Sequence, residues 1–172
     1  MAHSAAHRRG FLGSAAAAAL AVAWAAHALE APTDKVILTI SGTLSQTNDN
    51  GAASFDLALL QKLPQRSFST RTPWYPQARK FTGVALTDLL AAAGARVGAL
   101  RAVALNDYRV EIPVDDLTQH GAMLAYLLDD KPMAVREKGP LAIIYPFDHA
   151  PELRSAVYYS RAIWQLRRIE LK

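Results

Sequence analysis

The stretch TRTPWYPQARKFTGVALTDLL, residues 70–90, decides how the rest of the chain is interpreted. Its first half is polar, basic and aromatic. Its second half leads into a short apolar helix that Thr87 can cap and Gly94 can end. The polar half could be an ordinary solvated loop. It could equally be one wall of a pocket for a flat, anionic ligand. Features elsewhere in the sequence are needed to decide between these two interpretations.

The first 28 residues have the composition of an export signal. Arg8 and Arg9 precede an alanine-rich apolar run that ends in AHA at residues 26–28, the order of a secretory signal peptide. The adjacent arginines favour the twin-arginine export route. The apolar run is shorter than the roughly 20 residues that a membrane span needs, although a retained anchor is the alternative. We therefore expect cleavage after Ala28, a periplasmic location without stable membrane insertion, and one domain over residues 29–172.

The charge balance of that domain gives no support for nucleic-acid binding. Arg8 and Arg9 are the only charged residues before residue 29, so the 19 basic residues fall to 17 against 15 acidic ones. A net charge of +2 without blocks of like charge gives no basic surface for nucleic acid. The sequence also contains no cysteine, so it offers no thiolate as a nucleophile or as a soft metal ligand.

Apolar patterning predicts an α+β fold of short elements. Strands are expected over residues 35–41, 67–72, 100–105, 109–112, 141–145 and 167–172, and helices over 54–63 and from residue 88 to Gly94. Residues 123–128 fit a strand or a short helix, and residues 151–165 could be helical. The elements do not alternate as regular βαβ units, which favours α+β over a parallel α/β fold.

Three clusters of polar and aromatic residues remain as candidate sites. They are residues 71–80, residues 106–108 on a tight link between two strands, and residues 144–147 together with Tyr158, Tyr159 and Trp164. None of them contains a phosphate loop, a nucleophile elbow or histidines at metal spacing. Each cluster alone is explained as well by structure as by function.

The order of the clusters carries a resemblance. T-x-T-P-W, F-T-G-V-x-L-x-D-L-L, N-D-Y-x-V-x-I-P, D-D-K-P, G-P-L-A-I-I-Y-P and the final W-Q-L-R-R-I follow one another along the chain. Over residues 36–171 this series resembles the molybdopterin-binding domain of the sulfite oxidase family. The resemblance implies an α+β fold with a pocket for a pterin that bears a dithiolene and a phosphate.

The resemblance also implies which residues line that pocket. A planar pterin with polar edges suits aromatic walls and hydrogen-bonding side chains, and its phosphate suits arginine or lysine, including Arg79. The expected ligand-binding residues are Arg71, Thr72, Trp74, Lys80, Asn106, Asp107, Tyr108, Tyr145 and Arg161.

One departure from the family changes the functional expectation. Family enzymes bind molybdenum through a cysteine on the strand before this motif, where residues 67–72 here offer only serine and threonine hydroxyls. A hydroxyl stays protonated near neutral pH and is a hard ligand, so we expect a pterin or molybdopterin-like ligand without molybdenum. A serine oxygen as the metal ligand stays open.

We favour a non-catalytic pterin-binding protein. The chain is similar in this respect to small cysteine-less members of the fold, which look like pterin-binding sensory proteins. Such a protein would be a sensory partner of the periplasmic domain of an inner-membrane signalling protein. The first alternative is a molybdopterin-dependent oxidoreductase subunit with a non-cysteine metal ligand. The second is a structural or interaction module that keeps the fold without a ligand.

Overall fold

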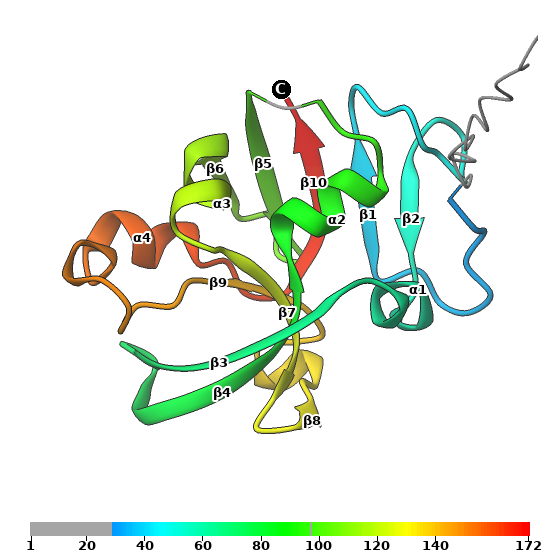
Figure 1. Ribbon diagram of the computed structural model, residues 1–172. Coiled ribbons are helices and arrows are strands. Elements are labelled where there is room, and N and C mark those ends of the chain that lie inside the picture. The colour runs from blue at the N-terminus through cyan, green and yellow to red at the C-terminus, as the bar shows by residue number, and fades with distance from the viewer. Residues whose placement is uncertain (1–28, 97) are drawn as a thin grey trace, which may run out of the picture.

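The computed structural model describes residues 29–96 and 98–172 (Figure 1). The signal sequence expected over residues 1–28 therefore lies outside the described residues. Two five-stranded sheets make up the fold, and short helices connect their strands. This arrangement confirms the predicted α+β class, because strands of the two sheets do not alternate with helices in a regular way.

The last strand in sequence lies in the middle of the first sheet. The strand order is β2-β1-β10-β5-β6, and the bounds are β1 Leu38–Ser41, β2 Ala53–Phe55, β5 Ala99–Ala104, β6 Arg109–Pro113 and β10 Leu166–Leu171. Strand β10 pairs in parallel with β1 and antiparallel with β5. The β1–β2 and β5–β6 hairpins are therefore joined into one sheet only through β10.

The second sheet carries the long hairpin that projects at the bottom of Figure 1. Its order is β3-β4-β7-β8, with β9 on the other part of β7, and the bounds are β3 Gln65–Thr72, β4 Tyr75–Ala85, β7 Met123–Leu128, β8 Lys131–Pro132 and β9 Ala142–Ile144. Only the last part of β4, from Phe81 onward, pairs with β7. The first part of β4 pairs with β3 alone and is exposed to solvent.

The helices are one to two turns long and begin differently from the sequence prediction. Their bounds are α1 Leu57–Lys62, α2 Leu86–Ala92, α3 Val114–Gln119 and α4 Ala156–Arg161, with single 3-10 turns η1 Val135–Glu137 and η2 Pro151–Leu153. The cap of α1 is Asp56, whose carboxylate accepts from Leu59 N at 2.8 Å. Helix α2 begins one residue before Thr87 and has no side-chain cap, so the predicted Thr87 cap was wrong.

The buried Asp56 carboxylate also fixes the first described residues. Its second oxygen accepts from Thr33 N at 2.8 Å and from Asp34 N at 3.0 Å. The hydrogen bond from Leu59 lowers the pKa of Asp56 most, and the bonds from Thr33 and Asp34 lower it further. A carboxylate in this position favours its charged form and ties the N-terminal segment to α1.

The part of the chain between β9 and β10 connects the two sheets. Ile143 N donates to Ile163 O at 2.8 Å, Leu166 N donates to Leu141 O at 2.9 Å, and Trp164 forms a bridge with Ala142. Residues 163–166 therefore pair with β9 of the second sheet just before the chain enters the first sheet as β10. This crossing places the Trp164 ring between the sheets.

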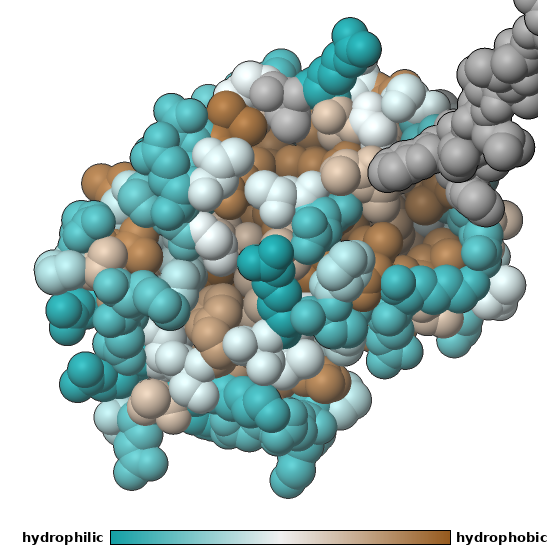
Figure 2. Space-filling model, in the orientation of Figure 1, coloured by the Kyte–Doolittle hydropathy of each residue, from teal (hydrophilic) through white to brown (hydrophobic). Residues whose placement is uncertain are grey.

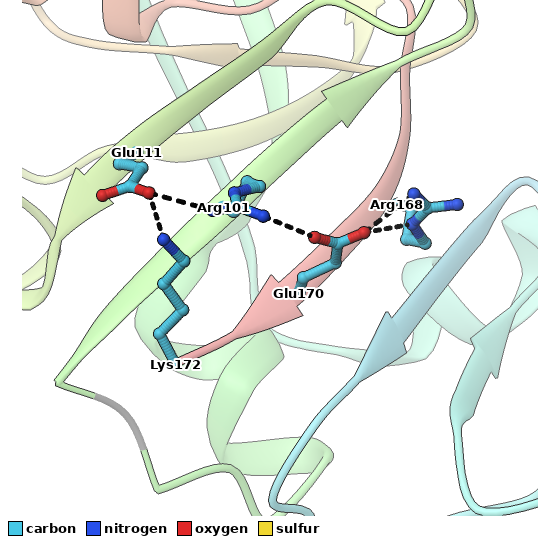
Figure 3. A network of polar contacts seen from close by, with 5 residues as sticks. All are labelled: Arg101, Glu111, Arg168, Glu170 and Lys172. Carbon is cyan, nitrogen blue, oxygen red and sulfur yellow. Dashed lines mark hydrogen bonds and ion pairs between the residues drawn. The ribbon is translucent and has the colours of Figure 1, made fainter.

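Charged side chains on neighbouring strands cover one face of the first sheet (Figure 3). Arg101 on β5 contacts Glu111 on β6 at 3.2 Å and Glu170 on β10 at 3.5 Å. Arg168 contacts Glu170 at 2.7 Å, and Lys172 contacts Glu111. Arg101 thus pairs with acidic residues on both neighbouring strands, and opposite charges on paired strands stabilise a sheet.

The face seen in Figure 2 is hydrophilic over the hairpin and β8, and hydrophobic residues show in the middle, near α1 and α2. The interior behind it is apolar, and its largest fully buried side chains include Phe55, Phe81, Tyr145 and Phe147. Within residues 29–96 and 98–172, no helix is long and apolar enough to cross a membrane.

The structure corrects the interpretation of residues 70–80 as a loop, while Arg71, Thr72 and Trp74 do line hollows at its surface. The stretch forms the end of a hairpin, with Thr70 opposite Arg79 and a register shift between Thr70 and Thr72. Residues 76–78 of β4 are all exposed, so no apolar alternation predicted this part of the strand. The predicted strands over 67–72, 100–105, 109–112 and 167–172 are confirmed, and residues 123–128 are a strand.

Gly83 of the F-T-G-V motif is where β4 passes closest to β7. A Cβ atom at this position would lie 1.9 Å from Leu124 O and 2.7 Å from Ala125 Cα. Both atoms belong to the backbone of a paired strand and cannot move aside without breaking the ladder. The register of the β4–β7 pair shifts between Thr82 and Gly83, so the close approach also marks an irregularity in the sheet.

We predict that Gly83→Ala destabilises the protein by about 1–3 kcal/mol or more, the cost of overpacking a filled interior. Gly98→Ala is the matched control, because the nearest atom to its added Cβ, Lys172 O, is 4.0 Å away. Urea denaturation followed by circular dichroism measures both free energies of unfolding. Equal values for the two variants would contradict the close approach of β4 and β7.

Candidate functional site

Two adjoining hollows lie where the tip of the β3–β4 hairpin meets α4. The first, which we call the Trp74 pocket, has a volume of about 280 Å³ and is lined by Trp74, Asn106, Tyr108, Tyr159, Trp164 and Gln165, among others. The second, the Arg71 hollow, has a volume of about 260 Å³ and is lined by Arg71, Thr72, Pro73, Asp148, Arg154 and Tyr159. Tyr159 lines both, so the two hollows share a wall.

Aromatic rings packed edge to face build the wall of the Trp74 pocket. The centroid of the Trp74 ring lies 5.3 Å from that of Trp164 and 6.1 Å from that of Tyr159, at interplanar angles of 82° and 78°. Tyr75 and Phe81 support Trp164 from β4, at 6.1 and 6.2 Å. Such pairs hold each ring in one orientation and leave flat surfaces for a planar ligand.

The turn between β5 and β6 supplies the polar side of the same pocket. Asn106 Oδ1 accepts from Tyr108 N at 3.1 Å, which closes an Asx turn, and Tyr108 OH donates to Ser160 O at 3.2 Å. Asp107 has a φ of 64° and pairs with Arg167 on β10. Asn106 and Tyr108 therefore line the pocket, and Asp107 holds the turn from behind.

Two buried polar atoms beside the hollows lack a hydrogen-bond partner among the described residues. They are Nε1 of Trp164, in the Trp74 pocket, and Oγ1 of Thr72, in the Arg71 hollow. Thr72 is 8% exposed. A buried donor or acceptor without a partner costs about 1–3 kcal/mol.

Arg71 and Asp148 form an ion pair at the mouth of the Arg71 hollow. Asp148 accepts from Arg71 N at 2.8 Å and from Arg71 Nε at 3.2 Å, and Asp148 N donates to Thr70 Oγ1 at 3.1 Å. The backbone hydrogen bond from Arg71 lowers the pKa of Asp148 most. The side chain of Arg71 is 69% exposed, so its guanidinium is accessible to an anion.

Lys80 and Arg79 lie further along the hairpin and line neither hollow. Lys80 Nζ contacts Asp130 at 2.8 Å, and Arg79 pairs with Asp129 and stacks on the Tyr75 ring at 4.7 Å. The hydrogen bond from Lys80 N is the main cause of the lowered pKa of Asp129. Both cations are held by the turn between β7 and β8, away from Trp74.

Tyr145 and Arg161 form a buried brace and line neither hollow. Tyr145 OH donates to Asp116 Oδ2 at 3.0 Å, and Arg161 contacts the same oxygen at 2.8 Å. Burial raises the pKa of Tyr145 strongly, and the Asp116 charge raises it further. The brace joins β9, α3 and α4, so it positions α4, which carries Tyr159 into the site.

The sequence therefore predicted some of the residues that line the two hollows and missed others. Of the nine expected residues, the structure places Trp74, Asn106, Tyr108, Arg71 and Thr72 in the two hollows. It confirms Tyr159 and Trp164 of the third cluster as lining residues and adds Gln165, Asp148 and Arg154. No pattern in the sequence marked these three polar residues.

The sequence model of the oxidoreductase molybdopterin binding domain matches residues 61–150, which is more than half of the chain. The chain belongs to this family. The matched region contains β3, β4 and the Asn106–Tyr108 turn, and so includes most of the site described above. Membership of the oxidoreductase molybdopterin binding domain family confirms the resemblance to sulfite-oxidase-type domains and supports a pterin-type cofactor.

A solved structure with the same fold is the sulfane dehydrogenase SoxCD from Paracoccus pantotrophus. The TM-score is 0.58 at 17% sequence identity, over 78% of this chain and 37% of that chain. The likeness shows the fold, and the chain spans little more than a third of the length of the SoxCD chain. No curated protein sequence matches this chain.

The residues of the site fit the organic part of a molybdopterin better than its metal. Aromatic faces, the unpaired Trp164 and Thr72 atoms and the exposed Arg71 guanidinium suit a planar, polar-edged ring with an anionic arm. The sequence has no cysteine to supply a thiolate, and the hydroxyls of Thr70 and Thr72 are hard ligands. We therefore derive no step through a metal.

We predict that Asp116→Ala destabilises the protein by about 3–5 kcal/mol, because it leaves Arg161 and the Tyr145 hydroxyl without their partner. Asp115→Ala is the control, since Asp115 is exposed on the same helix and its loss costs at most about 1 kcal/mol there. Thermal and chemical denaturation measure both. A loss in Asp116→Ala no larger than in the control would mean that the brace does not hold α4.

Proposed function

We propose that this domain binds a pterin in the Trp74 pocket and the Arg71 hollow without carrying out redox chemistry. The observation that carries the proposal is a site complete for the ring and the anionic arm of a pterin in a chain without any cysteine. The ring would lie against Trp74 and Tyr159, its polar edge would face Asn106, and its anionic arm would face Arg71.

Such a domain acts through another protein. We propose that it works in the periplasm as a sensory partner of an inner-membrane signalling protein, whose periplasmic domain reads the bound or free state. Support comes from the export-type sequence over residues 1–28 and from the lack of redox ligands in the site. Ligand binding can shift such a partner only through its different affinity for the free and the complexed forms.

The second candidate is an oxidoreductase subunit with a non-cysteine metal ligand. The family description and the structural neighbour, a sulfane dehydrogenase, favour it. The Thr72 hydroxyl is the observation that would serve this candidate, because it is buried beside Arg71 without a partner among the described residues. Metal content separates the two candidates directly.

We predict that Arg71→Ala weakens pterin binding by about 1.5–3 kcal/mol, the range for a hydrogen bond to a charged group. Trp74→Ala should weaken binding through the lost ring contact. Isothermal titration with tetrahydrobiopterin and with a phosphorylated pterin measures both. The control is Arg66→Ala, since Arg66 lies on the same strand and its side chain is 63% exposed. Affinities unchanged from wild type in both site variants would place the pterin elsewhere.

We predict that protein purified from an exporting, molybdate-replete host carries a pterin and far less than one molybdenum per chain. The reason is that the sequence has no thiolate to bind the metal, and the hydroxyls of Thr70 and Thr72 do not ionise readily near neutral pH. Native mass spectrometry identifies the organic ligand, and elemental analysis counts the metal. A content near one molybdenum per chain would favour the oxidoreductase. Loss of molybdenum from the Thr72→Val variant would then identify the Thr72 hydroxyl as a metal ligand.

A further inference from the structure

An apolar groove lies on the other side of the Asn106–Tyr108 turn from the Trp74 pocket. Its volume is about 170 Å³, and it is formed by the segment leading into β1, the end of β5, η1 and the start of β10. Val36, Leu105 and Val135 line it and are 40%, 43% and 53% exposed. We call it the Val135 groove.

The exposed apolar residues of this groove stand out within the described surface. Six large hydrophobic side chains there are exposed, and three of the six line this one groove. Single exposed hydrophobic residues are normal, but a cluster around a concavity is typical of an interaction surface. The volume suits an aliphatic side chain inserted from a partner.

The charge around the groove selects the kind of partner. Lys35 and Arg167 are the ionisable residues that line it, and both are basic. Arg167 is partly neutralised by Asp107, whereas Lys35 has no ion-pair partner within the described part of the chain. An aliphatic side chain next to a carboxylate would therefore complement the groove in both shape and charge.

The groove and the Trp74 pocket share a wall. Asp107, in the turn that lines the pocket, pairs with Arg167 of the groove. Gln165 lines the pocket, and its Nε2 donates to Val135 O at 2.8 Å, while its own carbonyl accepts from Leu105 N at 2.9 Å. Gln165 has a φ of 53°, and such left-handed backbone at a non-glycine residue is held only by its surroundings.

We propose that the Val135 groove docks a segment of the partner protein that presents an aliphatic side chain beside an acidic one. The ligand in the Trp74 pocket acts on this docking through the turn at Asp107 and through Gln165, a part of the inference that rests on the proposed function. The partner therefore contacts the outside of the wall whose inside contacts the pterin, and no opening of the pocket is required.

Fluorescence anisotropy on the full domain tests the docking with defined peptides. The probe is a labelled peptide array in which leucine or isoleucine neighbours glutamate or aspartate, compared with copies carrying lysine for the acid or serine for the aliphatic residue. We expect binding by the acidic aliphatic peptides alone. Val135→Asp and Val36→Asp should each weaken it about tenfold or more. Val157→Asp is the control, because Val157 is 54% exposed outside the groove and should change the affinity less than twofold.

Three results would overturn the docking. They are no preference for acidic aliphatic peptides, equal binding by wild type and both groove variants, or a dimer in light scattering that the groove variants abolish, which would make a second copy the occupant. Titration of the wild-type domain with tetrahydrobiopterin and with the acidic aliphatic peptide separates this inference from the proposed function. If the wild type binds pterin but no peptide, the docking proposal is wrong and the proposed function stands. If it binds peptide but no pterin, the proposed function is wrong and the docking stands. If the peptide affinity is the same with and without bound pterin, pterin binding in the Trp74 pocket does not act on docking in the Val135 groove.

Discussion

The passage of β4 beside β7 at Gly83 is the constraint on which the rest of the fold depends. Because a backbone carbonyl occupies the space of a Cβ atom there, β4 can leave the solvated hairpin and enter the core as Val84 and Ala85. Helix α2 follows directly, and the hairpin on the other side places Trp74 against Trp164. The core and the candidate site are thus positioned by two ends of one strand.

The sequence predicted the fold well where burial imposes a period. In β1, buried Leu38 and Ile40 alternate with the half-buried Thr39 and Ser41, so the period of a strand is visible in the sequence there. The sequence did not predict the first part of β4, because residues 76–78 are exposed in succession and show no apolar alternation. The start of α1 was also misplaced. The helix begins after its cap, Asp56, and the sequence did not show that residues 54 and 55 belong to the preceding strand.

The site was predicted in part, and the errors have a common cause. Aromatic and polar residues that point into one hollow come from the hairpin, the β5–β6 turn and α4, and no sequence spacing reports which of them meet. Tyr145 and Arg161 were expected at the ligand through the resemblance to the family alone. The structure uses them with Asp116 inside the protein, where their chemistry positions a helix.

The place of β10 in the first sheet has a consequence for how the protein is made. A ribosome releases β1 and β2 early and β5 and β6 later, but residues 166–171 join the two hairpins only after the other strands of this domain have been synthesised. Contacts between β1 and β10 close a chain segment of more than a hundred residues, and such closure is slow. The first sheet can therefore close only once residues 166–171 are available, and until then the unpaired edges of β1 and β5 are open to other chains.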